Sequence, residues 1–540
     1  GGDATGVSAD GTGDVLLEAR TAGSDVIVNA GVLSGTGHIT LNAANDVDIN
    51  AVLTTGGTGT VYVLSGADTD VDAAITSASG DILVDAGNDI SQTALITSTS
   101  GDVGVIAGQD VTQTATGDIT TTGGDVLVEA TSGSLTMDGS AEITAGGQDV
   151  LGLAGTNIVL GVIRMTDGTT NRVALQAVSG SLTDANAGSI NIEETVPGAA
   201  TSVSLRAGTI IGGAPGTSTG VNAQALDLNV DTVAASSATG VYLRELAAGG
   251  AIEVNTAASV SIDIDGVVRS DFDSGTTDVS EDRMLSSLAD LTTGSNGAIK
   301  LVAESGTITV NGGGDATGVS ADGTGDVLLE SRTGGTAGSD VVINAGVLSG
   351  TGHITLNAAD DVDVNAVLTT GGSGTVYINA GDDEATGING IALDAVVTTV
   401  DGDVLLTSAD DISQTALITS TNGDIGLIAS DTITQTATGD ITTTDGDVLV
   451  DAGGHWTMDG AAEITAGGQD VLGQSGGTIT LGVIRVTDAA MNQIALSAAE
   501  SIVDGNSDSL NIEETDPGAA TSVSLRAGTG MIGGAGGTTS

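Results

Sequence analysis

The chain has 540 residues, including 85 glycines, three prolines and no cysteine, and its formal charge is −59. These values exclude disulfides and thiolate metal sites, and they leave nucleic-acid binding without a basic surface. No apolar run approaches the roughly 20 residues of a membrane span, so membrane insertion is not expected. The hydrophobic fraction of 39% nevertheless provides enough apolar surface for a folded core.

A short repeat begins near the N-terminus. Its turns contain glycine followed by a hydrophobic residue two positions later. The turn glycines of the first periods are Gly13, Gly37, Gly59, Gly80, Gly101 and Gly124. Each period contains three short strand-like segments, such as Asp81–Asp85, in which one face is apolar. A period of about 22 residues indicates a solenoid, and three strands per period predict an all-β parallel β-helix.

The monotony of the sequence follows from this fold. Equivalent residues of successive coils would stack at roughly 4.8 Å, so that identical residues form files along the solenoid. Glycine provides the backbone conformations of the corners. Aspartate and asparagine stabilise turns by hydrogen bonding to the nearby backbone.

A longer repeat divides the chain. The segment Gly1–Glu18 returns unchanged as Gly313–Glu330. We therefore expect a first solenoid copy over residues 1–214, a spacer over 215–312 and a second copy over 313–535. Residues 536–540 then correspond to the start of a further spacer, as in a piece of a longer array.

The spacer should contain further solenoid coils and one surface elaboration. Its sequence Ser280–Leu291 predicts a short helix over residues 280–291. Ser280 would cap the N-terminus of this helix, and four apolar side chains would share one of its faces. These are Met284, Leu285, Leu288 and Leu291.

Residues suited to catalysis do not form a pattern. His38 and His353 are equivalent in the two copies, whereas His455 and the following tryptophan replace a serine and a leucine of the first copy. A catalytic group would not be exchanged in this way between copies of one chain. We therefore assign no catalytic and no cofactor-binding residue, and we expect that the protein is not an enzyme.

Cation binding is the strongest chemical possibility. Stacked turns would bring carboxylate and carbonyl oxygens together, and these are the ligands that Ca²⁺ prefers. The candidate ligands are Asp46, Asp70, Asp89 and Asp110. The alternative is a set of solvated turns with diffuse counterions, because aspartate is an ordinary turn residue.

The motifs "GHITLNAANDVDINA", "GDILVDAGNDISQTALI" and "GVYLRELAAGGAIEV" resemble the repeats of filamentous-haemagglutinin-like adhesins. The resemblance covers nearly all of both copies and is weaker over residues 265–300. It implies a right-handed parallel β-helix that serves as a shaft, with binding modules elsewhere. Together with the short repeat, it predicts triangular coils of about 22 residues.

Several expectations about function follow. The chain should be a structural segment of a very large secreted repeat protein that forms an extracellular or cell-surface fibre of a bacterium. Its partners would be further repeats or other copies, by continuation or end-to-end stacking, and a cell-surface glycan or protein of a host. One alternative is an adhesin shaft that binds a receptor or glycan laterally, through residues 265–300. Another is a β-helical enzyme acting on polysaccharides.

Overall fold

A computed structural model describes residues 5–196, 198–213, 224–246, 250–273, 275–332, 338–381, 390–467, 470–487, 491–506, 510–516 and 520–533. These residues form strands, turns and bends but no helix. The described residues therefore include no helix that is long and apolar enough to cross a membrane. The expected start of a further spacer at 536–540 lies outside the described residues.

The chain divides into two compact units, which are described separately. The first contains Gly1–Leu246 and Thr256–Ala289, and the second contains Ala247–Asn255 and Asp290–Ser540. This division does not coincide with the boundaries of the sequence repeat. One segment of the spacer, 256–289, belongs to the unit that holds the first copy.

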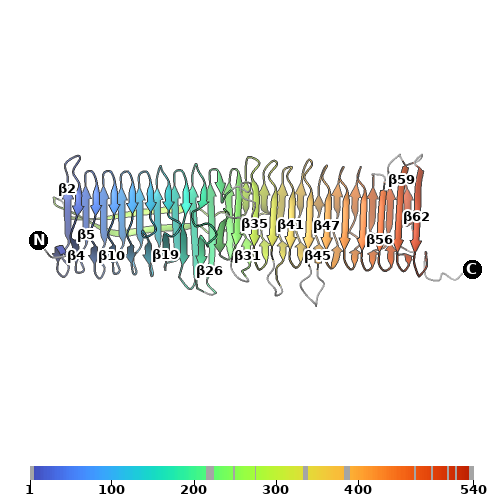
Figure 1. The fold of residues 1–540 in the computed structure, drawn as a ribbon, viewed down its shortest axis with the longest axis horizontal. Coiled ribbons are helices and arrows are strands. Elements are labelled where there is room, and N and C mark those ends of the chain that lie inside the picture. The colour runs from blue at the N-terminus through green and yellow to red at the C-terminus, as the bar shows by residue number, and fades with distance from the viewer. Residues whose placement is uncertain are drawn as a thin grey trace, which may run out of the picture. The chain divides into compact units, whose positions relative to one another are not determined.

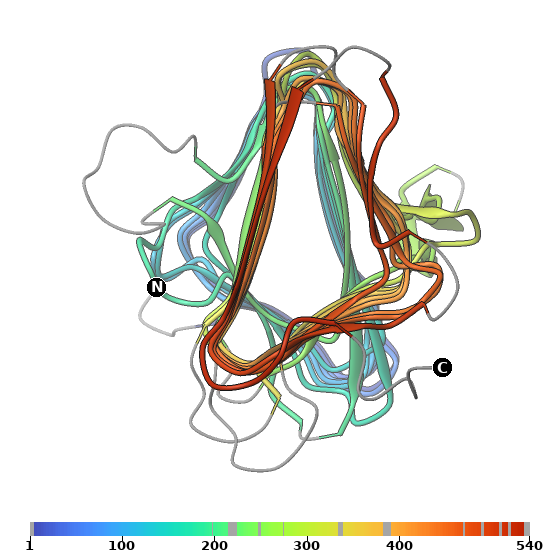
Figure 2. The ribbon, with the colours of Figure 1, turned by 90° about the vertical axis from the view of Figure 1, so that its right-hand side faces the viewer.

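Each unit is a stack of three-stranded coils (Figure 1). In one representative coil, β8 (Val61–Ser65) is followed by β9 (Thr69–Val71) and β10 (Ile75–Ser77). The next strand, β11 (Ile82–Ala86), then pairs in parallel with β8. Viewed end-on, the coils of each unit have three sides (Figure 2). The predicted parallel β-helix is confirmed.

One side of each coil carries the longer strands, and we call this side the broad face. In the first unit its strands are β2 (Val15–Ala19), β5 (Ile39–Ala43), β8, β11, β14 (Val103–Ala107), β17 (Val126–Ala130), β20 (Asp149–Ala154), β23 (Thr170–Ala177), β26 (Ala200–Ala207) and β29 (Thr232–Ser237). In the second unit they are β35 (Ala298–Ala303), β38 (Val327–Ser331), β41 (Ile354–Ala358), β44 (Val376–Ala380), β47 (Val404–Ser408), β50 (Ile425–Ala429), β53 (Val448–Ala452), β56 (Asp470–Ser475), β59 (Met491–Ala498) and β62 (Ala520–Ala527).

The other two sides carry mostly three-residue strands in strict register. Ile75 pairs with Ile96, and Ile96 pairs with Ile119, so that each partner lies one coil further along the chain. All three side chains are completely buried. Because the side chains of a strand alternate between its two faces, the inward positions form continuous files of Val, Ile and Leu. The files make up a dry aliphatic core inside the coils.

The predicted helix over 280–291 is wrong. Residues Gly275–Leu285 form strand β33, which pairs antiparallel with β32 (Val260–Asp271) in a two-stranded hairpin. Leu288 forms an isolated antiparallel bridge to Ala257, and Leu291 begins the short strand β34 (Leu291–Thr293). The apolar residues do not share one helical face, because Leu285 is buried whereas Met284 is 68% exposed. Met284 and Leu285 lie on opposite faces of β33 instead.

Substitutions at two neighbouring positions test the alternation. Ile96 points into the core, and Leu95 is 37% exposed. Ile96→Ala should lower the free energy of unfolding by about 2–5 kcal/mol, because the buried side chain leaves a cavity. Leu95→Ala, as the control, should change it by about 0.5 kcal/mol. Urea titration of both variants provides the measurement, and equal effects would contradict the inward assignment of Ile96.

Candidate functional site

The aspartates that follow the turn glycines bond one coil to the next. The carboxylate of Asp81 accepts the backbone N–H of Asp102 at 2.8 Å. Asp102 in turn accepts the N–H of Asp125 at 2.7 Å, and Asp125 accepts that of Asp149 at 2.9 Å. A hydrogen bond to an ionised acceptor is stronger than one between neutral groups. The repeated aspartate is therefore a structural link along the solenoid.

The glycine before each of these aspartates is required by close backbone contact. A Cβ atom on Gly80 would lie 2.3 Å from the carbonyl oxygen of Gly59, in the preceding coil. A Cβ on Gly101 would lie 2.5 Å from the carbonyl group of Gly80. No side chain fits at this distance, so a larger residue at Gly80 or Gly101 would force the backbone to move. The Gly-Asp pair thus has a steric cause and an electrostatic one.

Three of the four candidate calcium ligands belong to a second file of this kind. Asp46 accepts the N–H of Asp68 at 3.1 Å, Asp68 accepts that of Asp89 at 3.2 Å, and Asp89 accepts that of Asp110 at 2.9 Å. Asp70 lies apart, in the middle of β9, where it pairs with Asp48. Burial and then the nearby Asp48 raise the pKa of Asp70. Asp68 was not among the predicted ligands, although it lies one coil from both Asp46 and Asp89 and therefore belongs to the same file.

The histidines occupy positions in similar files. The Nδ1 atoms of His38 and His353 accept the backbone N–H of the following coil at 3.1 Å. His455 does the same at 3.0 Å. Each imidazole thus takes the place of an aspartate carboxylate, and this bond requires an unprotonated Nδ1.

Trp456, which replaces a leucine of the first copy, is completely buried. Its indole N–H donates to Oε1 of Gln435 at 3.0 Å. In the first copy, the equivalent Oε1 of Gln113 has no hydrogen-bond partner among the described residues. An unpaired buried polar atom is destabilising. The tryptophan therefore satisfies a core amide, which gives it a structural role.

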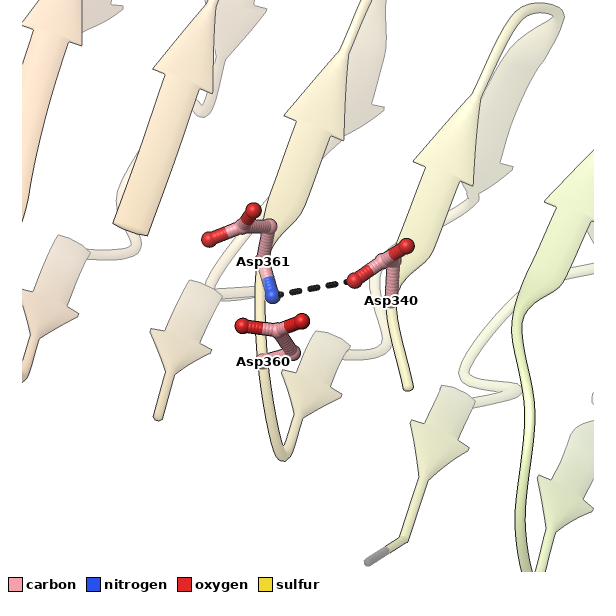
Figure 3. A group of neighbouring side chains, drawn as sticks. All are labelled: Asp340, Asp360 and Asp361. Atoms are coloured by element: carbon pink, nitrogen blue, oxygen red, sulfur yellow. Dashed lines mark hydrogen bonds between the residues drawn. The ribbon is translucent and has the colours of Figure 1, made fainter. Parts of the chain in front are cut away.

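Two groups of three aspartates bring carboxylate oxygens within 4.8 Å of one another. One group is Asp340, Asp360 and Asp361 (Figure 3), and the other is Asp410, Asp411 and Asp431. In the first group, the N–H of Asp361 donates to Asp340 at 3.3 Å. This bond resembles those of the aspartate files.

The first group has the chemistry of a site for a hard cation. Asp360 is only 4% exposed, and its Oδ1 atom has no hydrogen-bond partner among the described residues. Burial raises the pKa of Asp361 to about 6, against a hydrogen bond from Gly390, and the carboxylates of Asp360 and Asp340 add to the shift. Clustered carboxylates are ligands for Ca²⁺, and a bound cation would relieve both the repulsion and the unsatisfied oxygen.

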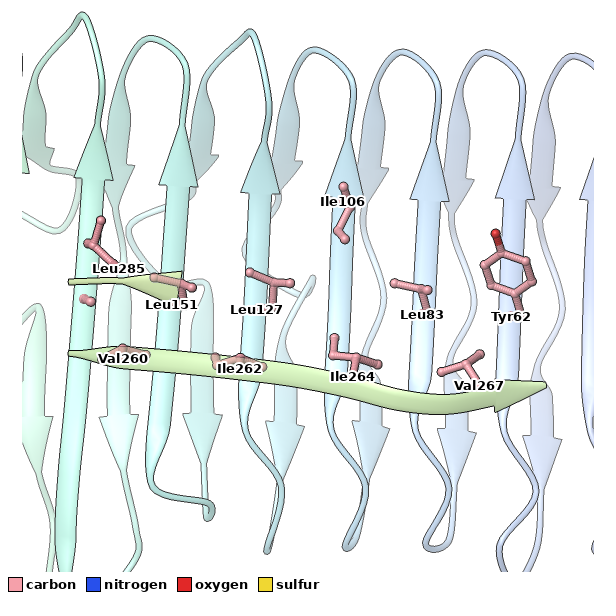
Figure 4. Close-up of a cluster of buried hydrophobic side chains, with 11 residues drawn as sticks. Tyr62, Leu83, Ile106, Leu127, Leu151, Val260, Ile262, Ile264, Val267 and Leu285 are labelled. Carbon is pink, nitrogen blue, oxygen red and sulfur yellow. The ribbon is translucent and has the colours of Figure 1, made fainter. Parts of the chain in front are cut away.

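The hairpin β32–β33 covers the outer surface of the broad face in the first unit. There, Tyr62, Leu83, Leu127 and Leu151 point outward and are at most 4% exposed. β32 runs across the coils and packs Val260, Ile262, Ile264 and Val267 on them (Figure 4). The hydrophobic effect thus holds the hairpin on the solenoid.

Arginine side chains of the first unit strengthen this attachment. Arg283 on β33 binds Glu129 of the broad face at 2.5 Å, and Arg20 binds Asp273 near the hairpin turn. Arg206 donates to the backbone carbonyls of Ser286 and Ser287 at 2.8 and 2.9 Å. A chain with only 11 basic residues thus uses several of them at one element. The turn itself carries Phe272, which is 83% exposed and lies within the segment 265–300 considered for lateral binding.

No protein-family model, curated protein or solved structure matches the chain. Its function is therefore inferred from the geometry described above.

Asp102 provides a test of the aspartate files. Burial raises its pKa to about 6, although the hydrogen bond from Asp125 opposes the shift. Since this value lies above the ordinary 3.8, protonation favours the folded state, and stability falls as the pH rises from about 4 to about 6. Asp102→Asn should raise the free energy of unfolding at pH 7 by about 1–2 kcal/mol, a value discounted for solvent screening. The gain should be smaller at pH 5.

Asp102→Ala is the matched control in the same urea titrations. It removes the charge and also the acceptor for the N–H of Asp125, so it should be less stable than Asp102→Asn by about 1–2 kcal/mol at both pH values. A loss of stability in Asp102→Asn at pH 7 would contradict the assignment, because the charged hydrogen bond would then outweigh desolvation.

Calcium should stabilise the protein through the first aspartate group. Addition of Ca²⁺ to protein treated with a chelator is expected to raise the melting temperature by several degrees, since a ligand that binds only the folded state stabilises it. Asp360→Asn should abolish most of this increase. Asp445→Asn, at an exposed position outside both groups, should leave it unchanged. An equal response of the two variants would contradict calcium binding at the first group.

Proposed function

We propose that the chain is a non-catalytic structural segment of a bacterial extracellular or cell-surface fibre, and that its function depends on length and stiffness. The observation that carries this proposal is the use of the repeated residues. The glycines of the corners, the aspartates and the histidines all make contacts between one coil and the next. Residues that an enzyme would gather at one site are here distributed over many of the described coils in each unit.

The energetics support a mechanical role. Continuous backbone pairing on three sides of each coil resists stretching and bending, because deformation would break many hydrogen bonds together. The aliphatic core adds a term that grows with every coil. The high negative charge keeps neighbouring fibres apart and in solution.

The resemblance of the repeats to filamentous-haemagglutinin-like adhesins supports the same proposal, because it implies a β-helical shaft. Neither nucleic acid nor an anionic membrane surface suits a chain of charge −59. Further repeats or other copies of the chain are the partners that the proposal requires.

Removal of whole coils tests the dependence on length. Val397 pairs with Ile418, and Ile418 pairs with Ile441, so residues 397–440 are two complete coils. Their deletion should preserve the β-sheet signal in circular dichroism and shorten the particle by roughly 10 Å in solution scattering, at one strand spacing per coil.

Deletion of residues 397–407 is the control, because it removes only part of a coil and shifts the inward residues out of register. This variant should lose cooperative unfolding. The proposal fails if the two-coil deletion unfolds in the same way, or if its maximum dimension does not decrease.

A further inference from the structure

The second unit repeats the outer surface that the hairpin covers in the first. The row of outward residues beneath β32 has the same residue in the second copy at every position, and the register of the broad face places these residues on successive strands in both units. The equivalent pairs are Tyr62 and Tyr377, Leu83 and Leu405, Gly104 and Gly426, Leu127 and Leu449, Leu151 and Leu472, and Ala174 and Ala495.

This row is open in the second unit. Tyr377 is 36% exposed and Leu472 is 40% exposed, whereas Tyr62 and Leu151 are buried. Between them lies a hollow of about 440 Å³, lined by Leu405, Gly426, Leu449 and Leu472 and flanked by four aspartates. An exposed apolar surface of this kind indicates an interaction site. We call it the open row.

The glycine of the open row indicates which kind of side chain the hollow can receive. In the first unit, a Cβ on Gly104 would lie 2.4 Å from Cδ1 of Ile264, so a larger residue at this position would force the end of the isoleucine side chain to move. In the second unit, a Cβ on Gly426 would meet only Cδ1 of Leu405, at 3.0 Å. No described atom of the second unit lies as close to this Cβ as Ile264 lies to that of Gly104, yet glycine is present at both positions. The hollow at Gly426 has the place and the lining of the one that receives Ile264.

The neighbouring row is different. Beneath β33, the first unit has Leu64 and Leu153, which pack against the hairpin. Their equivalents in the second copy are Asn379 and Gln474. The surface for the outer strand of a hairpin is thus more polar at these two positions in the second unit, whereas Ile106 of the same row has an isoleucine, Ile428, as its equivalent.

From these observations we propose that the open row is a docking surface for a β-hairpin of the same kind as β32–β33. Its inner strand carries β-branched apolar side chains at alternate positions, one of which enters the hollow at Gly426. Aspartates beside the row are compatible with docking, because β32 already lies near Asp81 and Asp102 in the first unit, where burial and then Asp265 and Asp263 of that strand raise the pKa of the two carboxyls.

The absence of cysteine from the chain permits a direct test by disulfide trapping. A second copy of residues 215–312 is appended after Ala535, at the junction equivalent to Ala214, so that a hairpin becomes available to the second unit. Gly426→Cys is combined with Ile264→Cys in the appended segment. Gly104→Cys with Ile264→Cys in the original hairpin is the positive control. Val367→Cys, an exposed site in the second unit, is the negative control.

We expect an intrachain disulfide at Gly426→Cys to form at least about tenfold faster than at Val367→Cys, because docking raises the effective concentration of the two thiols. Formation no faster than at Val367→Cys, with the positive control intact, would overturn the proposal. Disulfides that join position 426 of one chain to position 426 of another would also overturn it, in favour of association through a second copy of the row.

A measurement in trans does not depend on the folding of the extended chain. A synthetic peptide of residues 256–289 that carries Ile264→Cys is added to the full chain with Gly426→Cys or Val367→Cys. Preferential labelling of Gly426→Cys by about tenfold is the expected result. Equal labelling of the two sites would count against a hairpin as the occupant.

Discussion

The close stacking of each coil on the next constrains every other feature of this protein. At one strand spacing, a residue has its own equivalent as its nearest neighbour, so a side chain must be compatible with a copy of itself. Aliphatic side chains meet this condition by packing. Aspartate would not meet it through its charge, since like charges at this distance repel. It does so because each carboxylate accepts a backbone N–H of the following coil, as between Asp81 and Asp102.

This arrangement has an electrostatic consequence. The aspartate files combine a favourable charged hydrogen bond with unfavourable burial, and for Asp102 and Asp361 burial is the larger effect on the pKa. His38 and His353 fill the same role without a formal charge. The files thus tolerate any side chain that places a hydrogen-bond acceptor near the backbone N–H of the following coil. This tolerance accounts for differences between the two copies that would be unexpected in an active site.

The coil repeat could be predicted from the sequence because it is local: the glycine spacing and the alternation of apolar residues define the strands and the corners. The grouping of Asp46, Asp89 and Asp110 followed from the same period, and Asp70 was misplaced because it lies on the strand beyond the file. The hairpin could not be predicted in this way. The apolar residues of the hairpin pack on Leu83 and Leu127, which are distant in the sequence. The available signal was the uninterrupted apolar run Ile82-Leu83-Val84, which indicates that β11 is buried on both faces.

The glycine beneath β32 has a further consequence for folding. Because neighbouring coils have nearly identical sequences, the repeat itself does little to distinguish one coil from the next during folding. The row that the hairpin crosses is uneven, with a tyrosine, a leucine and then the gap at Gly104. A hairpin displaced by one coil would drive Ile264 against Leu83 or Leu127 instead of into that gap. The hairpin therefore packs best in one register on the broad face, the register in which Ile264 lies over Gly104.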